Sequence, residues 1–198
     1  MANEFKTSGI SNETPKNIMF GAGVVYKGCS LEGGKFTVGE VIGATSGGTK
    51  VAITPEYKHI EVDGALVKVK DLTVKIGETA TLETNLVEIT PELIKQLVVG
   101  ADGEAATVET GTYAHIVSSE RIVEGDYVSG LAFVGNTIDG RKVIVLFENA
   151  LCTSGFSIDG KNKENSVVPA TFECYANLEA SHEKLPYHII YPTTQAAD

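Results

Sequence analysis

The chain has 198 residues, of which 42% are hydrophobic, and its 26 acidic and 16 basic residues give a net charge of −10. This length suits one domain with a full core and is too short for two large ones. Lysine and arginine are not clustered against the acidic excess, which disfavours sequence-specific DNA binding. The N-terminus has no cationic stretch followed by an apolar one, and no run of about 18 apolar residues occurs, so we expect neither export nor a membrane partner.

Residue usage favours strands over helices. The chain has 21 glycines and no tryptophan, and Val, Thr and Ile recur in short runs, a pattern typical of strands joined by tight turns. The cysteines Cys29, Cys152 and Cys174 form an odd set without the close spacing of a disulfide framework or a zinc knuckle. We interpret them as small buried side chains in a reducing cytoplasm.

The first half of the chain divides into an arm and the start of a single β domain. Residues 1–16 are polar and without period, which predicts an N-terminal arm outside the core, and residues 17–198 form the domain. The apolar run 18–26 predicts a buried first strand. Seven glycines in 28–48 predict a long Gly-rich loop, and loops of this length are often functional or ordered by a partner.

Three Asp-Gly pairs predict hairpin turns. Alternating runs at 49–54, 57–62 and 65–70 surround Asp63-Gly64, and the same pair recurs at Asp139-Gly140 and Asp159-Gly160. Asp-Gly suits the type I′ turn because both central residues need a positive φ. Three hairpins favour an antiparallel sandwich or barrel.

A long strand and one helix follow. In 72–89, apolar residues alternate with an acidic polar face, which predicts a half-buried strand with Ala80, Leu82, Thr84 and Leu86 on one side. Thr90 as N-cap, Pro91 at the first position and a stop at Gly100 predict a helix whose Leu93, Ile94 and Leu97 face the sandwich. Further strands are expected at 113–118, 127–134, 142–151, 167–178 and 187–191. The predicted fold is mainly β, an antiparallel β-sandwich or barrel with one flanking α-helix.

The sequence shows no convergent set of catalytic residues. The stretch 43–50 is similar to a phosphate-binding loop, but a strand and not a helix follows it. His182 and His188 are two residues too far apart for a zinc-binding helix. We therefore predict no enzyme, no cofactor and no metal site. A carbohydrate-binding or adhesive β-sandwich module remains the alternative function, although such a module favours exposed aromatic platforms and the chain has no tryptophan.

The order of these elements resembles the major tail proteins, or tail tube proteins, of long-tailed bacteriophages. The most specific part is the hairpin sequence Glu61-Val62-Asp63-Gly64 followed by the acidic strand and the capped helix. The resemblance covers about residues 17–98, and beyond them only the rhythm of strands matches.

The resemblance implies a phage tail-tube-like β-sandwich, related in fold to the tubes of contractile tails and type VI secretion systems. Such a virion structural protein self-assembles as stacked hexameric rings in the bacterial host cytoplasm and forms the tail tube. DNA passes through the channel during genome ejection without specific binding. Besides other copies of itself, its expected partners are tape-measure and tail terminator proteins.

Two sets of residues follow from that interpretation. We assign subunit and ring contacts to the Gly-rich excursion Leu31–Lys50 and to the arm Ala2–Pro15. The contact residues are Phe5, Leu31, Gly33, Gly34, Phe36, Val41 and Ile42. The acidic residues expected to line the lumen are Glu78, Glu83 and Glu88.

Overall fold

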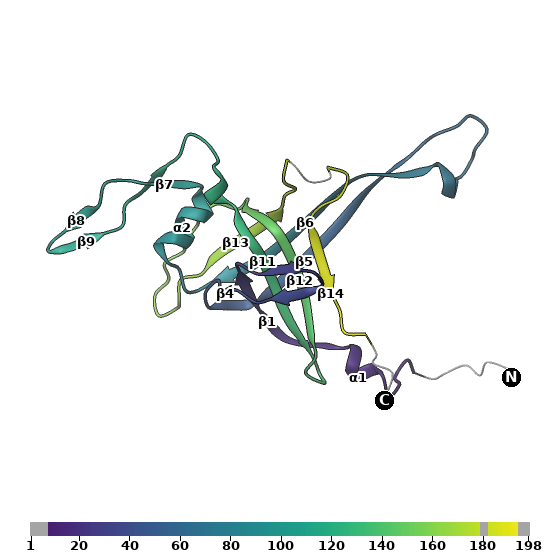
Figure 1. Cartoon of the computed structure of the whole chain (residues 1–198), viewed down its shortest axis with the longest axis horizontal. Helices are drawn as coiled ribbons and strands as arrows, with labels where there is room; N and C mark the ends of the chain where they lie inside the picture. The colour runs from purple at the N-terminus through teal and green to yellow at the C-terminus, as the bar shows by residue number, and fades with distance from the viewer. Residues whose placement is uncertain (1–7, 179–181, 194–198) are drawn as a thin grey trace.

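The computed structural model describes residues 8–178 and 182–193 and shows a β-sandwich with projecting hairpins (Figure 1). Eight strands form its large antiparallel sheet: β1 (Met19–Lys27), β4 (Glu40–Val41), β5 (Thr45–His59), β6 (Thr73–Leu86), β11 (Val128–Thr137), β12 (Lys142–Cys152), β13 (Val168–Cys174) and β14 (Tyr187–Ile190). Their order is β4-β1-β11-β12-β13-β6-β5, and β14 pairs with β12.

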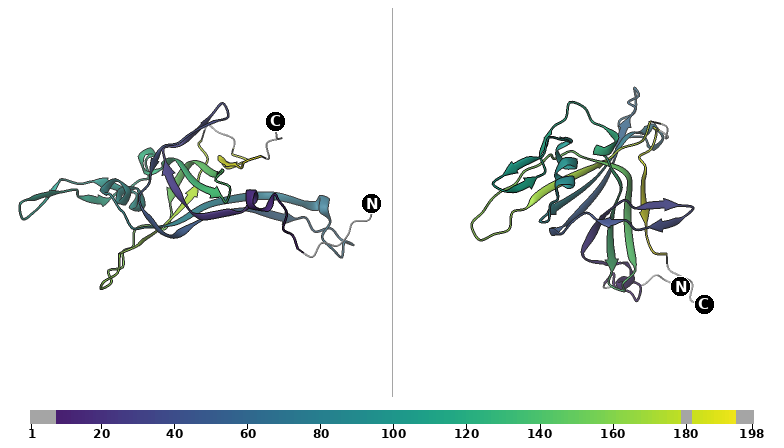
Figure 2. Two further views of the ribbon diagram at one scale, coloured as in Figure 1. Left: turned by 90° about the horizontal axis from the view of Figure 1, so that it is seen from below. Right: turned by 60° about the vertical axis from the view of Figure 1, so that its left-hand side comes forward.

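Strand β12 divides this sheet into two layers. Its residues Ile144–Phe147 pair with β14, whereas Ala150–Cys152 pair with β13. One layer therefore contains β4, β1, β11 and β14, and the other contains β13, β6 and β5. Figure 2 shows the molecule from two further directions, with hairpins projecting from its centre. The predicted fold class is confirmed: a mainly β, antiparallel sandwich with a flanking helix.

The main core lies between the two layers and under helix α2 (Pro91–Val98). Phe147 of β12 and Phe172 of β13 are its largest fully buried side chains. The predicted alternation in β6 is confirmed, since Ala80, Leu82 and Leu86 are buried in this core. Full burial of one such side chain stabilises the fold by about 1.5–3 kcal/mol.

Helix α2 begins as predicted and ends differently. The Oγ1 of Thr90 accepts a hydrogen bond from the amide of Leu93 at 3.3 Å. The left-handed residue that ends the helix is Val99, with φ 51°, and not Gly100. Gly100 instead begins strand β7 (Gly100–Asp102), where a Cβ would lie 2.7 Å from a methyl carbon of Ile116. The glycine is needed there for a close approach between neighbouring strands.

Residues 28–48, predicted as a long Gly-rich loop, form short strands instead. Strands β2 (Ser30–Glu32) and β3 (Lys35–Thr37) make a tight hairpin, and β4 and the start of β5 follow. Gly33 and Gly34 have φ values of 56° and 80°, which suits a type I′ turn. The glycines therefore make turns between strands in place of an open loop.

Of the three Asp-Gly pairs that predict hairpin turns, only one joins two strands directly. Asp139-Gly140 turns the chain from β11 into β12, as predicted. Asp63-Gly64 also forms a turn, but it lies inside the connection 60–72, and β5 pairs with β6 rather than with residues 65–70. Asp159-Gly160 lies in the connection 153–167 between β12 and β13 and makes no tight hairpin.

Strand β1 is far less buried than predicted. Val25 is its only fully buried residue, and Phe20 is 76% exposed. The pairing with β11 shifts register between Phe20 and Val24, where Gly21 and Gly23 have positive φ. A Cβ on Gly23 would lie 2.2 Å from the Phe133 ring, so this irregular segment crosses directly over that side chain.

The remaining elements are short. The strand predicted at 113–118 is divided between β9 and β10, and a second projecting hairpin is formed by β8 and β9. Arg141 ties the N-terminal helix α1 to the β11–β12 turn, because its Nη2 donates to the carbonyl oxygen of Lys16 at 2.7 Å. The bounds are α1 (Thr14–Asn17), β8 (Ala106–Val108), β9 (Gly111–Tyr113), β10 (Ile116–Ser118), and the 3-10 helices η1 (Lys70–Leu72) and η2 (Glu124–Asp126).

We predict that Phe172→Ala lowers the free energy of unfolding by about 3–5 kcal/mol, because it removes a fully buried ring from the main core. Urea denaturation followed by circular dichroism measures the change. Phe156→Ala is the matched control, since that ring is partly exposed in the connection after β12. Equal losses in the two variants would contradict this placement of the core.

Candidate assembly surface

The β5–β6 hairpin extends well beyond the sandwich. The two strands pair from Thr45 and Leu86 to His59 and Thr73, and the connection 60–72 closes the far end (Figure 1). Burial in β6 stops at Ala80. The part of the hairpin beyond the core, residues 57–76, is called the hairpin arm below.

The hairpin arm carries apolar side chains that the rest of the subunit does not cover. Leu66 is 98% exposed and Val67 is 76% exposed. The large exposed apolar residues of the arm are Tyr57, Ile60, Val62, Leu66, Val67, Val69, Val74 and Ile76. Monomeric soluble proteins rarely leave so many apolar side chains together in water, and such patches mark interaction surfaces.

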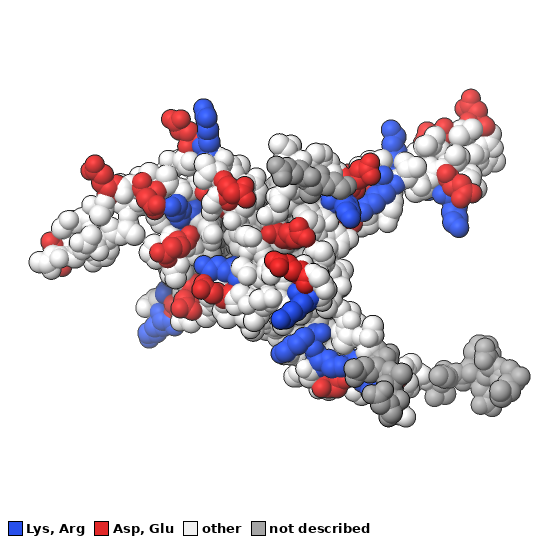
Figure 3. Space-filling model, viewed as in Figure 1, with Lys and Arg blue, Asp and Glu red and all other residues white. Residues whose placement is uncertain are grey.

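Charges on the hairpin arm are mixed (Figure 3). Lys68 and Lys70 alternate with Val67 and Val69 at its end, and the stretch 64–70 contains no acidic residue. Acidic residues lie on either side of this stretch. The arm therefore presents a short apolar and basic segment on a protein whose net charge is −10.

A hydrogen-bonded group anchors the base of the hairpin arm. The Nζ of Lys75 lies 2.9 Å from Oε2 of Glu78, and the hydroxyl of Tyr187 donates to Oε1 of Glu78 at 3.1 Å. The hydrogen bond from Lys75, assisted by that from Tyr187, holds the pKa of Glu78 below its ordinary value of 4.5. Because Tyr187 belongs to β14, this group connects the arm to the opposite layer of the sandwich.

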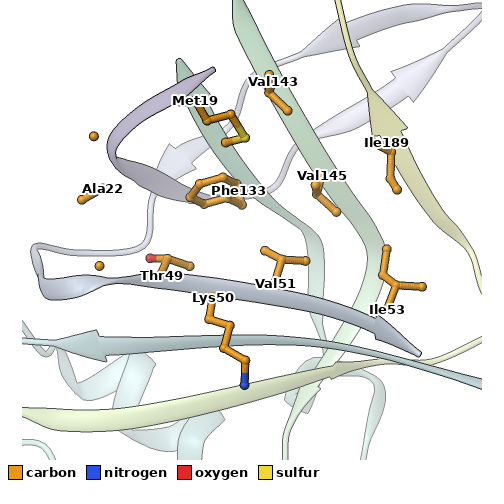
Figure 4. A pocket seen from close by; sticks show the side chains of 12 residues that line it. Met19, Ala22, Thr49, Lys50, Val51, Ile53, Phe133, Val143, Val145 and Ile189 are labelled. Atoms are coloured by element: carbon orange, nitrogen blue, oxygen red, sulfur yellow. The ribbon is translucent and has the colours of Figure 1, made fainter. Parts of the chain in front are cut away.

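An apolar groove of about 590 Å³ lies where β1 and β5 approach each other (Figure 4). Phe133, Val143, Val145 and Ile189 line it together with side chains of the two strands. Lys50 points away from the groove and pairs with Glu83, with 2.7 Å between Nζ and Oε1.

Both strands beside the groove have an unpaired edge. Among the described residues, β5 pairs only with β6, and Met19–Val24 of β1 pair only with β11. Unpaired edges present free backbone N–H and C=O groups that another strand can bind.

The acidic residues predicted for a lumen do not form one patch. Glu78 lies on the same face of β6 as the buried residues Ala80 and Leu82 and has a side chain only 10% exposed, whereas Glu83 lies on the opposite face of that strand. Glu88 follows the strand, and its Oε2 accepts a hydrogen bond from the amide of Ala44 at 3.1 Å. Each carboxylate thus has a partner in its own subunit, and the assignment to a lumen stays a prediction.

Most of the predicted contact residues lie in β2–β4 and not in the hairpin arm. Leu31 and Phe36 face each other and pack on the outer side of β11 and β12. Ile42 is buried in the main core, whereas Val41 is exposed and Gly33-Gly34 form an exposed turn. Phe5 lies outside the described residues.

The sequence-based assignment missed the apolar residues of the hairpin arm. The alternation of 65–70, which predicts a strand of the domain, contains their signal. The presence of Lys68 and Lys70 in that alternation indicates an extended segment whose polar side chains meet water.

Three further observations concern metal ions, membranes and cysteine chemistry. Within residues 8–178 and 182–193, no group of three or more His, Cys, Asp or Glu side chains is placed to hold a metal ion. The helices of the same residues include none that is long and apolar enough to cross a membrane. The three cysteines are free and buried, and burial raises the pKa of the Cys174 thiol to about 12, so it is protonated at neutral pH.

No protein-family model matches the sequence, and no curated protein gives a significant match. The proposed function therefore rests on the hairpin arm, the groove and the unpaired edges.

We predict that Glu78→Gln makes the melting temperature less sensitive to acid. Because the pKa of Glu78 is lower in the folded than in the unfolded chain, its stabilisation is present above about pH 4.5 and is lost as pH falls through the folded value. The amide does not titrate, so the variant lacks that part of the loss. Scanning calorimetry between pH 6 and pH 3 measures the difference.

Lys75→Gln is the companion variant, since it removes the donor that lowers the pKa of Glu78. It should also reduce the loss of stability in acid. If both variants followed the wild-type pH dependence, the anchoring role of this group would be refuted.

Proposed function

We propose that the protein is the structural subunit of a phage-type tail tube, polymerising as stacked hexameric rings around a DNA-conducting channel. The observation that supports this most is the hairpin arm, an apolar surface held outside the main core of the sandwich. Burying apolar surface contributes about 25 cal/mol per Å², so a partner that covers the arm gains substantial free energy.

One subunit carries two different surfaces at separate sites, and self-assembly follows if one binds the other on a second copy. A projecting arm on one part and unpaired strand edges on another favour head-to-tail contacts, which close into rings or continue as filaments. The number six, the DNA channel and the location in the virion tail come from the resemblance to major tail proteins. The tape-measure and tail terminator proteins are proposed as partners because of the same resemblance.

The charge of the chain suits a conduit for DNA. A net charge of −10 repels phosphates, so DNA inside such a tube slides without binding. Because Glu78, Glu83 and Glu88 are each paired within the subunit, this effect belongs to the overall charge rather than to those three residues.

The alternative of a carbohydrate-binding or adhesive module has less support. A sugar site combines an aromatic platform with nearby polar groups. The exposed aromatic residues Phe20, Tyr57 and Tyr113 lie on three separate elements, and the groove beside β1 is lined mainly by aliphatic side chains.

We predict that the double variant Leu66→Asp, Val67→Asp abolishes polymerisation and leaves the subunit folded. The two charges fall on the most exposed part of the hairpin arm, away from the core, so the circular dichroism spectrum and melting temperature stay close to wild type. Light scattering over a concentration series measures the loss of polymer.

The double variant Val108→Asp, Tyr113→Asp is the matched control, because both residues are exposed on the β8–β9 hairpin, which projects away from the arm (Figure 1). It should retain polymerisation. Unchanged polymerisation in the arm variant would refute the proposal, and a glycan that raised the melting temperature of the wild type would favour the binding module.

A further inference from the structure

The groove between β1 and β5 has the features of a site that receives a strand. Its floor is apolar, with Phe133, Val143 and Val145 facing the opening (Figure 4). On its two sides, Met19–Val24 and β5 have edges without a strand partner among the described residues. An extended segment placed there gains backbone hydrogen bonds and covers apolar side chains together.

The same chain carries a segment that fits this description. Residues Ala65–Lys70 alternate in the two-residue period of a strand, yet they belong to no strand in the subunit. Val69 has the extended backbone angles φ −93° and ψ 131°. Leu66 and Val67 at its start are the most exposed large apolar residues of the hairpin arm.

The segment cannot reach the groove of its own subunit. Ile53 lines the groove, and β5 continues from it to His59 in unbroken antiparallel pairing with β6, apart from one bulge. Six strand residues span about 20 Å, and the connection 60–72 lies beyond them. Folding back would break this pairing, so the groove and the segment must meet between different copies.

We propose that Ala65–Lys70 of one copy docks as an added strand in the β1–β5 groove of a second copy. This inference rests on the proposed function and identifies the contact that joins the subunits. Lys68 and Lys70 bring positive charge to a partner with net charge −10. Each subunit donates one segment and has one groove, so the contact repeats from copy to copy.

Disulfide trapping tests this contact. In the variant Leu66→Cys, Ala22→Cys, one thiol lies on the donated segment and the other lies on the exposed wall of the groove. The native cysteines are buried, so the introduced thiols are the reactive ones. The matched control is Leu66→Cys, Thr107→Cys, in which the second thiol lies on the exposed strand β8.

After mild oxidation, a non-reducing gel should show a ladder of linked copies at least tenfold stronger in the groove variant than in the control. Pelleting and electron microscopy of the same samples score polymers. Tubes without an excess of linked copies would overturn the groove contact and leave the proposed function standing. Linked copies without tubes or rings would support the groove contact and refute the tail tube, and the absence of both would refute both proposals.

Discussion

The antiparallel pairing of β5 with β6 is the interaction on which the rest of the structure depends. Its inner half places Leu82 and Leu86 in the main core, and its outer half becomes the hairpin arm. A slip of one residue would turn those leucines to solvent, so the core fixes the register of the whole hairpin. The arm therefore inherits a defined direction from the core, and the Glu78 group at its base connects it to the other layer.

Signals that are local in the sequence predicted the structure well. The alternation through Leu82 and the cap at Thr90 depend only on near neighbours, and both elements form as expected. Asp63-Gly64 predicted a turn correctly and the paired strand wrongly. The chain pairs β5 with residues 73–86 because these have leucines to bury in the core, whereas 65–70 have lysines at alternate positions. Burial in the core decides which strands pair. The residues of the turn alone do not determine this choice.

The candidate surfaces were harder to predict for the same reason. An apolar run normally indicates a buried strand, but Phe20 and Leu66 belong to apolar segments that the subunit leaves exposed. Conversely, Glu78 reads as a surface charge in the sequence and lies between Lys75 and Tyr187 in the fold. Which apolar residues remain uncovered depends on how many strands the core can accept. For residues 8–178 and 182–193, the structure shows which apolar side chains remain exposed. The hairpin arm and the groove are recognised from these side chains.

The main core is buried within one subunit while the arm is exposed, so burial of the core does not require a partner on the arm. This account is tested most directly by negative-stain electron microscopy of the purified wild-type protein over a concentration series. It predicts six-membered rings with an open lumen and, at higher concentration, tubes of stacked rings. Particles that remain single subunits at every concentration would contradict it.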